Sequence, residues 1–399
     1  MQERPNEGAP LSGIRVLDFT RYLAGPFCTM LLSDYGADVV RVESPKGREL
    51  RVPGSDRDSY FFLSANRGKR SLAVDLKRAR GRELIERLAP AYDVVVENFR
   101  PGVMDKLGLG ASTLMASNPR LVFCSISGFG SDGPYRDRPG FDQIAQGMGG
   151  FMSLTGTKEQ GPTRAGIAIC DLLAGMFAVQ GIQLALFSRE RTGRGQVVDA
   201  SLLESILGVL TWGAGMYFEG GKAPGPAGHH HPLASPYGRF RARDGYLNIA
   251  AGNDAMWTKL AHALGRPQWP QDPRFDSAGA RLRNRDALSE AIEQVLSTQG
   301  VEHWVQLLNE AGVPTGPVLN MEQVFNDPQV LAREMLVEMP HPVVGTFKTT
   351  GLPIKLSETP GRIQRRPPLL GEHTEEVLQE HGVSATELAE LRAEAVVSG

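Results

Sequence analysis

The chain has 399 residues, of which 41% are hydrophobic and 22% charged, and its formal net charge at pH 7 is −2. This length favours two domains with a sizeable core, and the charge balance argues against nucleic acid or a membrane as a partner. Cys28, Cys124 and Cys170 show no paired spacing, which predicts a reducing compartment without disulfides. The first residues are polar and lack the apolar core of a signal peptide, so we expect a cytoplasmic protein.

Strands and helices alternate through the first half of the chain. The pattern predicts strands over 13–20, 37–43, 71–76, 93–99 and 121–130, and helices over 24–36 and 79–92. Such alternation implies βαβ units and a mostly parallel sheet. Ligands bind beyond the carboxyl ends of parallel strands. Here those ends are followed by residues 21–26, 43–51, 97–104 and 128–133.

Gly128, Gly130 and Gly133 have the spacing of a dinucleotide-binding fingerprint and follow a predicted strand. That fingerprint also requires a helix that opens on the glycines. The next residues, 134–139, begin and end with proline and cannot continue as a helix. We therefore expect no NAD site here.

Asp171 is the only charged residue between Arg164 and Arg189, in a run that is otherwise apolar apart from two glutamines. A carboxylate in such a run is costly to bury unless its surroundings satisfy it, which makes it a candidate functional residue. The alternative is that Asp171 caps a core helix. The run is long enough to span a membrane, but a central Asp costs about 3 kcal/mol there, so we predict a buried helix.

The second half of the chain has a different texture. A strand over 197–200 and a helix precede residues 219–238, which are rich in Gly and Pro and predict a linker or ordered loop. A strand over 245–254 and three helices over 257–265, 287–297 and 301–312 follow. Short strands and two terminal helices end the chain.

No metal site is predicted at His229, His230 and His231, because adjacent histidines rarely share one ion; a loop that touches a ligand or a neighbouring chain is preferred. Cys170 is expected to be an inert core thiol.

Long stretches of the chain resemble the family III CoA-transferases, the group that includes formyl-CoA transferase, carnitine CoA-transferase and the α-methylacyl-CoA racemases. The similarity covers almost the whole length. It is carried by residues 11–47 (LSGIRVLDFTRYLAGPFCTMLLSDYGADVVRVESPKG), 66–77, 93–110, 118–150, 191–205 and 368–378 (PLLGEHTEEVL).

The resemblance implies that Asp171 is the nucleophile that attacks an acyl-CoA thioester, giving an aspartyl anhydride and then an aspartyl-CoA thioester. The oxyanions need fixed donors, and the backbone N–H groups of Gly147, Gly149 and Gly150 are the candidates. CoA is a substrate, so no permanently bound cofactor or metal is expected. Similarity to formyl-CoA transferase assigns CoA contacts to Tyr22, Leu23, Val74, Asp75, Leu76, Lys77, Asn98, Phe99, Arg100 and Lys106.

Two positions depart from formyl-CoA transferase, which resembles this chain but has glutamine where Leu23 stands and arginine where Ser44 stands. One polar contact and one phosphate contact are therefore in doubt. Arg48 or Arg51 is the expected replacement for the arginine.

The resemblance includes racemases, so the two activities must be separated. The racemases carry an acid/base histidine thirty residues before the catalytic aspartate, where this chain has Phe141. Phenylalanine cannot move a proton, which favours CoA transfer.

Members with a His-rich loop before a Pro-Tyr pair, here Pro236 and Tyr237, often use succinyl-CoA and a small dicarboxylic acid. His229, His230 and His231 are therefore candidate acyl or acceptor contacts. A racemase and a catalytically silent CoA-binding paralogue stay as alternatives.

The resemblance also implies the architecture. We expect a Rossmann-like α/β large domain with a parallel sheet, built from both ends of the chain, and a smaller α+β domain. The expected boundaries are 1–200 and 326–399 for the large domain, 201–228 for a linker and 229–325 for the small domain. Two subunits are expected to interlock as a homodimer.

Overall fold

The structure is a computed structural model that describes residues 8–47 and 58–399. Its largest element is a seven-stranded sheet in the order β14-β3-β2-β1-β4-β5-β8. All neighbouring strands are parallel except β14, which pairs antiparallel with β3. The strands are β1 (Arg15–Asp18), β2 (Asp38–Glu43), β3 (Arg70–Val74), β4 (Val94–Glu97), β5 (Val122–Ser127), β8 (Val197–Ser201) and β14 (Val397–Ser398). The predicted α/β class with a mostly parallel sheet is confirmed.

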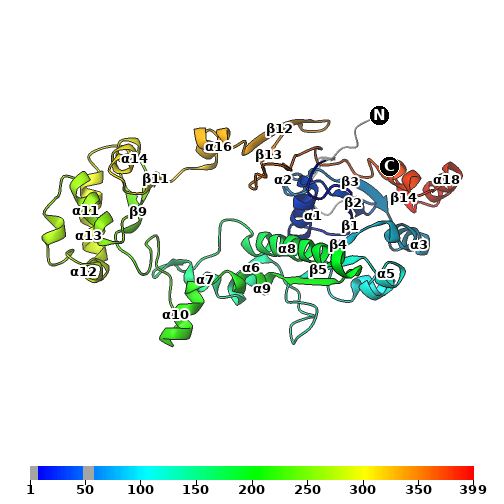
Figure 1. Ribbon diagram of the computed structural model, residues 1–399, viewed down its shortest axis with the longest axis horizontal. Helices are drawn as coiled ribbons and strands as arrows, with labels where there is room; N and C mark the ends of the chain where they lie inside the picture. Colours follow the sequence, from blue (N-terminus) through cyan, green and yellow to red (C-terminus); the bar gives the residue numbers. More distant parts are fainter. Residues whose placement is uncertain (1–7, 48–57) are drawn as a thin grey trace. The chain divides into compact units, whose positions relative to one another are not determined.

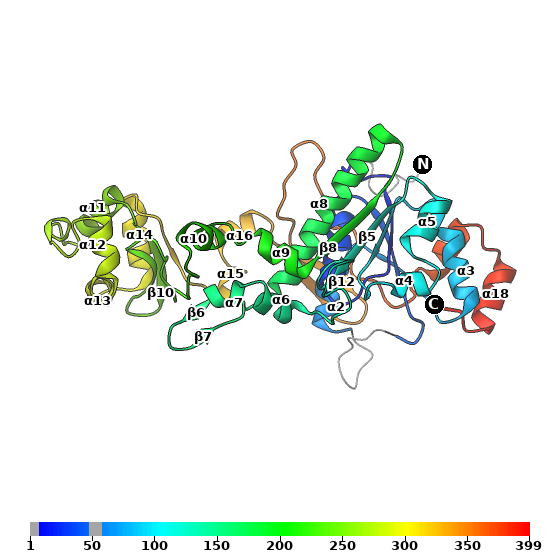
Figure 2. The ribbon, with the colours of Figure 1, turned by 90° about the horizontal axis from the view of Figure 1, so that it is seen from below.

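Both faces of this sheet are covered by helices, which is why its strands read as nearly continuous apolar runs. Successive residues of a strand point to opposite faces, so Val16 and Val39 join one core cluster while Leu17 and Val40 join the other. One face carries α1 (Ala24–Asp34), α6 (Asp142–Met148), α8 (Ile169–Thr192) and α9 (Leu202–Gly208). The other carries α3 (Ala79–Leu88), η1 (Ala89–Ala91), α4 (Val103–Lys106), α5 (Ala111–Ser117), α17 (Thr374–Glu380) and α18 (Ala385–Ala393). The two layers are visible in Figure 1 and, turned by 90°, in Figure 2.

The end of the chain returns to the first sheet. Strand β14 adds to the edge at β3, and the N–H of His373 donates to the carbonyl of Ser71 at 3.0 Å. Residues from α17 and α18 complete the core cluster beside α3. The last helix was predicted, but β14 was not, because two residues carry no strand pattern of their own.

The chain folds into two compact units. The first comprises residues 1–151, 165–212 and 329–399, and the second comprises residues 152–164 and 213–328. Besides the sheet, the first unit holds α2 (Tyr60–Ser64) and the hairpin of β12 (Leu336–His341) and β13 (Gly345–Thr350). Residues 201–228, expected to form a linker, contain α9 and α10 (Trp212–Gly220). The domain boundaries and the homodimer stay predictions.

The second unit is an α+β arrangement around a three-stranded antiparallel sheet in the order β11-β10-β9. Its core is formed by apolar residues of the sheet and three helices, with Trp257 almost fully buried. The strands are β9 (Tyr237–Arg241), β10 (Tyr246–Ala250), β11 (Thr315–Pro317), β6 (Gly156–Thr157) and β7 (Gly161–Pro162). The helices are α11 (Asp254–Ala263), η2 (Trp269–Gln271), α12 (Ala278–Arg283), α13 (Arg285–Leu296), α14 (Val301–Glu310) and α15 (Met321–Val324). Two further helices, α7 (Phe151–Leu154) and α16 (Pro328–Ala332), lie where the chain passes between the units.

Helix α8 contains the apolar run around Asp171. Among the described residues it is the one helix long and apolar enough to cross a membrane, a test that the core helix of a soluble protein also passes. Gly175 lets α8 approach α1, because a Cβ there would lie 2.7 Å from the carbonyl oxygen of Ala24. Ala174, Ala178 and Ile182 are fully buried in the cluster between α8 and the sheet. This packing supports the prediction of a core helix.

Candidate active site

Strands β1 and β4 lie next to each other at the point where the strand order reverses. Such a reversal leaves a crevice beyond the carboxyl ends of the two strands. Asn98, which directly follows β4, joins the two rims of the crevice. Its Oδ1 accepts from the backbone N–H of Arg21 at 2.7 Å, and its Nδ2 donates to the carbonyl of Arg21 at 2.7 Å. Tyr22, which follows Arg21, has a φ of 60°. Such strained backbone conformations are found most often at functional sites.

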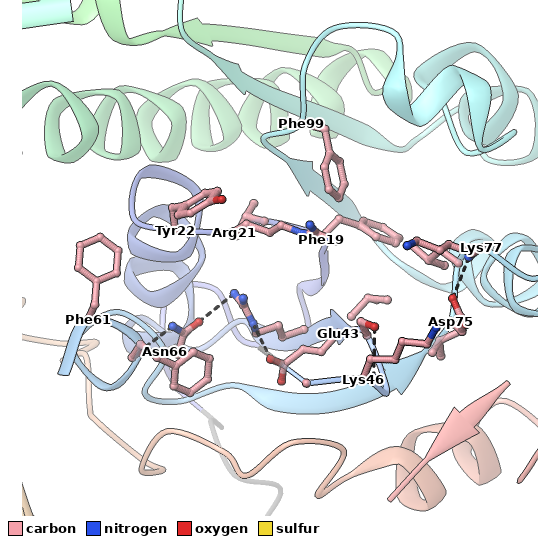
Figure 3. A pocket seen from close by; sticks show the side chains of 18 residues that line it. Phe19, Arg21, Tyr22, Glu43, Lys46, Phe61, Asn66, Asp75, Lys77 and Phe99 are labelled. Atoms are coloured by element: carbon pink, nitrogen blue, oxygen red, sulfur yellow. Dashed lines mark hydrogen bonds and ion pairs between the residues drawn. The ribbon is translucent and has the colours of Figure 1, made fainter. Parts of the chain in front are cut away.

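One pocket, here called the lysine pocket, has a volume of about 330 Å³ and lies at the carboxyl ends of β1, β2 and β3. Figure 3 shows Lys46 and Lys77 at one end of the view and Tyr22 and Phe61 at the other. Apolar walls suit a flat base, and lysine ammonium groups suit phosphates. Its apolar lining consists of Phe19, Val42, Phe61, Phe62, Val74, Leu76 and Phe99.

A network of buried charges supports the floor of the lysine pocket. The fully buried ammonium of Lys69 donates to Asp18 Oδ2 at 3.0 Å and to Asn66 Oδ1 at 2.9 Å. Arg41 Nη1 donates to the same Asn66 oxygen at 3.0 Å, and Arg41 Nε lies 3.4 Å from Glu43 Oε2. Burial lowers the pKa of Lys69 to about 8. Burial opposes ionisation of Asp18 too, but Lys69 and Arg41 outweigh it and leave the pKa of Asp18 below its usual value.

A second pocket, here called the aspartate pocket, has a volume of about 290 Å³ and contains Asp171. Arg21, Tyr22 and Phe99 line both pockets, so the two pockets lie next to each other along the crevice. The lining also includes the glycine-rich turn after β5 and four arginines. The arginines are Arg21, Arg100, Arg136 and Arg138.

Asp171 sits in the first turn of α8, where the helix dipole favours a negative charge. Burial disfavours the negative charge on Asp171. Together with the nearby charge of Asp142, it raises the pKa of Asp171 to about 7. The carboxyl group is therefore poorly solvated and close to the balance between its two protonation states at neutral pH. A carboxylate held in this way can act as a nucleophile or as a proton carrier.

Asp142 caps α8 from a different helix. Its Oδ1 accepts from the backbone N–H of Cys170 at 2.8 Å and of Asp171 at 3.4 Å. Its Oδ2 accepts from Gln146 Nε2 at 2.6 Å, and Gln146 Oε1 accepts from the backbone N–H of Ala165 at 2.8 Å. Gln146 is fully buried, so this chain of bonds fixes the start of α8 against α6. Burial and the charges of Asp142 and Asp171 raise the pKa of Cys170 to about 12, consistent with an inert thiol.

Glu97, the last residue of β4, fixes the loop that follows. Its carboxyl group accepts from the Ser125 hydroxyl and from the backbone N–H of Phe99, the latter at 2.8 Å. Burial raises the pKa of Glu97 to about 7, although both hydrogen bonds lower it. Phe99 is thereby held in the lining that the two pockets share.

Most of the predicted CoA contacts lie in the two pockets. Tyr22, Val74, Asp75, Leu76, Lys77 and Phe99 line the lysine pocket, and Leu23, Asn98 and Arg100 line the aspartate pocket. Lys106 is exposed at the end of α4 and is not among the lining residues of either pocket. Arg48 and Arg51 lie outside the described residues. Ser44 does line the lysine pocket, beside Lys46.

The glycines expected to supply oxyanion donors lie at the end of α6. Gly147, Gly149 and Gly150 are not among the residues that line the aspartate pocket. The N–H of Gly149 donates to the carbonyl of Ala145 at 2.8 Å, and that of Gly150 to Gly147 at 3.4 Å, because both follow the last turn of α6. Gly149 instead allows close packing, since a Cβ there would meet Ile206 at 2.2 Å. Their role as donors stays an untested prediction.

The three histidines belong to the second unit. The N–H of His231 donates to the carbonyl of Tyr237 at 2.8 Å, and the two rings stack with centroids 4.9 Å apart. Arg239 Nη2 lies 3.5 Å from His229 Nδ1. Burial lowers the pKa of His229 and of His230, which keeps both rings uncharged at neutral pH. The loop is thus ordered on β9, and its contact with a substrate stays a prediction.

Sequence reasoning missed several residues of the site. Arg41 lies in β2 and Lys69 lies directly before β3, and both strands are buried on both faces. A charged residue in or beside an apolar strand was the signal that could have identified them. Asp142 is 29 residues from Asp171, so their contact depends on the fold. Arg136 and Arg138 stand in a turn that was considered only as a failed dinucleotide fingerprint.

Comparison with known proteins gives consistent matches along the chain. Residues 11–374 match the family described as CoA-transferase family III. The succinyl-CoA:mesaconate CoA-transferase of Haloarcula hispanica is 41% identical over 94% of this chain and 96% of its own length. The succinate–glutarate CoA-transferase of Agrobacterium fabrum is 38% identical over 95% and 98%, respectively. The crystal structure of a CAIB/BAIF family protein from Brucella suis superposes with a TM-score of 0.85, at 40% identity, over 94% of this chain and 100% of that one.

Proposed function

The chain belongs to CoA-transferase family III, and on that premise we propose that it moves CoA from succinyl-CoA to a small dicarboxylic acid with Asp171 as the nucleophile. The observation that carries this proposal is the position of Asp171. It is a half-buried carboxyl group in a pocket that shares three lining residues with a second, lysine-bearing pocket at the switch point of a parallel sheet.

In the first half of the proposed reaction, a carboxylate oxygen of Asp171 attacks the carbonyl carbon of the acyl-CoA. The C–S bond breaks, the electron pair leaves with the CoA thiolate, and an acyl-aspartyl anhydride forms. The thiolate then attacks the aspartyl carbonyl of the anhydride. This gives an aspartyl-CoA thioester and releases the donor acid as its carboxylate.

The second half repeats these steps in reverse order with the acceptor. The acceptor carboxylate attacks the aspartyl-CoA thioester, which frees the thiolate and forms a new anhydride. Attack of the thiolate on the acceptor carbonyl gives the product thioester and regenerates the Asp171 carboxylate. No net proton is consumed in these steps. Because the attacking group is the carboxylate, Asp171 must be ionised when the donor arrives.

The surroundings of Asp171 suit this chemistry. Poor solvation leaves the carboxylate a stronger nucleophile. Asp142 holds the first turn of α8 in place without contacting the donor. The guanidinium groups of Arg21 and Arg100, which line the aspartate pocket, are suited to the negative charge that develops on the carbonyl oxygen.

CoA is proposed to lie along the crevice with its nucleotide in the lysine pocket and its thioester in the aspartate pocket. Lys46 and Lys77 are the phosphate partners in this arrangement. Formyl-CoA transferase, which this chain resembles, has an arginine at the position of Ser44. Lys46, which sequence reasoning did not single out, takes over the role of that arginine. The pantetheine arm then passes Tyr22 and Phe99, which line both pockets.

The donor and acceptor are proposed from the relatives, which are named for succinyl-CoA and for mesaconate or glutarate. His229, His230 and His231 remain proposed acyl or acceptor contacts. A homodimer is proposed as well, and it would cover Met176, Phe177, Leu184 and Phe187, which are exposed on α8. We propose a cytoplasmic location.

The decisive experiment has two parts. Purified protein is incubated with a panel of acyl-CoA donors and carboxylate acceptors, and the thioesters formed are identified by mass spectrometry. Protein incubated with an active donor is then treated with hydroxylamine or borohydride and digested. Transfer together with a modification at Asp171 is expected. Transfer with the modification on Cys170 contradicts the proposed nucleophile, and bound CoA without any exchange indicates a silent paralogue.

A racemase is the second candidate. Among the described residues, the aspartate pocket is lined by one carboxyl group, that of Asp171, and by Phe141, whose ring meets that of Tyr22 edge-on with the centroids 5.8 Å apart. Racemisation needs two groups that carry protons on either side of the α-carbon. The side chain at this position therefore favours transfer.

A further inference from the structure

The four arginines of the aspartate pocket come from three different loops. Arg21 and Arg100 lie in the loops after β1 and β4, and Arg21 also lines the lysine pocket. Arg136 and Arg138 lie in the loop between β5 and α6 and do not line the lysine pocket. Arg21 is therefore the one arginine of the four that the two pockets share, and the other three line the aspartate pocket alone.

The side chain of Arg138 is positioned by an aromatic ring and not by an ion pair with a carboxylate. Its guanidinium carbon lies 3.7 Å from the ring centroid of Tyr135, and its backbone N–H donates to the Tyr135 carbonyl at 2.9 Å. Phe129 in turn packs edge-on against Tyr135, with ring centroids 5.9 Å apart. Stacking on an aromatic ring orients the plane of a guanidinium and leaves its edge free for hydrogen bonds.

Within the described part of the chain, Arg138 has no carboxylate partner at ion-pair distance, unlike Arg136, which lies 3.9 Å from Asp137. A guanidinium presents a planar fork of donors that matches a carboxylate in two parallel hydrogen bonds. A cation that is oriented, without an acidic partner and in the pocket of the nucleophile is suited to an anionic substrate group.

We propose that Arg138 binds the second carboxylate of the dicarboxylic acyl group while its first carboxyl carbon reacts at Asp171. This rests on the proposed function and makes Arg138 the residue that selects dicarboxylic over monocarboxylic acids. CoA phosphates are the other anions available. Their proposed partners are Lys46 and Lys77 in the lysine pocket, whose lining does not include Arg138.

The test compares acids of equal chain length with and without the second carboxylate. Wild-type protein, Arg138→Met and Arg138→Lys are assayed with glutarate against pentanoate as acceptors, and with succinyl-CoA against butyryl-CoA as donors. For Arg138→Met, kcat/KM with the dicarboxylic substrates is expected to fall by about 10- to 100-fold, while the monocarboxylic values change by less than about threefold. Arg138→Lys keeps the charge but loses the fork, so an intermediate loss is expected.

Two controls separate the explanations. Arg333→Met removes an exposed arginine remote in sequence from the site and should leave both ratios unchanged. Lys77→Met should raise KM for succinyl-CoA and butyryl-CoA alike, the pattern of a phosphate contact. If Arg138→Met shows this second pattern, or no change, Arg138 does not recognise the acyl group.

Binding gives a readout that is independent of turnover. In protein that also carries Asp171→Asn, calorimetry should show that Arg138→Met removes the preference for succinyl-CoA over butyryl-CoA. An unchanged preference overturns the proposal. Wild-type protein that transfers CoA only among monocarboxylic acids refutes the dicarboxylate part of the proposed function before any variant is made.

Discussion

The carboxylate of Asp142 accepts the backbone N–H of Asp171 at 3.4 Å and that of Cys170 at 2.8 Å, so one acidic side chain caps the helix that carries the other. The arrangement has two opposed effects. The cap fixes the backbone of Asp171, while the charge of Asp142 adds to burial in raising the pKa of Asp171 to about 7. Asp142 therefore fixes the backbone position of the proposed nucleophile and also contributes, after burial, to the raised pKa of its carboxyl group.

Replacement of Asp171 is expected to abolish transfer. Asp171→Asn keeps the shape of the side chain but removes the nucleophilic oxygen anion, and Asp171→Ala removes the side chain. A loss of at least about 100-fold in kcat is expected for both, with retained affinity for CoA. Transfer rates and CoA binding by calorimetry check this. Activity above about one hundredth of wild type in both variants would contradict the assigned role.

The pH dependence of transfer should show the ionisation of Asp171. Because the attacking group is the carboxylate, kcat/KM of the wild type is expected to fall as the pH drops below about 7. Asp142→Asn removes a negative charge that raises this pKa, so the fall should move to lower pH. The amide oxygen can still accept the N–H of Cys170, although the bond from Gln146 is lost at a cost of about 1 kcal/mol. A pH profile that is unchanged, or displaced to higher pH, argues against this coupling.

The raised pKa of Asp171 also predicts a stability effect. Between pH 4 and pH 7 the folded state keeps a proton that the unfolded state has lost, so ionisation destabilises the wild type as the pH rises through this range. Asp171→Asn avoids that cost. At pH 8 the variant is expected to be more stable by about 1 kcal/mol or more, and below pH 4 the difference should vanish. Urea unfolding at fixed protein concentration and several pH values measures it, and a difference independent of pH would contradict the burial of an ionisable group.

The architecture was more predictable than the site. The alternation of apolar strands and amphipathic helices was sufficient to predict the parallel sheet, because each element has a local periodicity. Asp171 could be singled out because it interrupts an apolar run. The contact of Asp142 with Asp171 could not be predicted, since only the packing of α6 against α8 brings together residues 29 apart in sequence. The glycines at 147–150 were read as a loop with free donors, but α6 extends to Met148 and uses the N–H groups that follow.

Removal of Lys69 should destabilise the protein. Its ammonium is fully buried and donates to Asp18 Oδ2, Asn66 Oδ1 and the Pro26 carbonyl at 2.9–3.0 Å. Lys69→Met leaves the buried carboxylate of Asp18 with less compensation, at a cost of about 3–5 kcal/mol. Lys46→Met, in the exposed wall of the same pocket, should change stability by less than about 0.5 kcal/mol. Equal unfolding free energies for the two variants would show that the buried network contributes little.

The last prediction concerns Phe141, which lines the same pocket as Asp171. Phe141 is 61% exposed, lines the aspartate pocket and packs edge-on against Tyr22. Since it cannot carry a proton, wild-type protein in heavy water should not introduce deuterium at the α-carbon of a 2-methylacyl-CoA. Phe141→His places a base in this pocket and is expected to give slow exchange, which Phe141→Leu should not. The double variant Phe141→His/Asp171→Asn should lose the exchange, because proton transfer across the α-carbon needs both groups. Ready deuterium incorporation by the unmodified protein, measured by mass spectrometry, would overturn the transferase assignment in favour of a racemase.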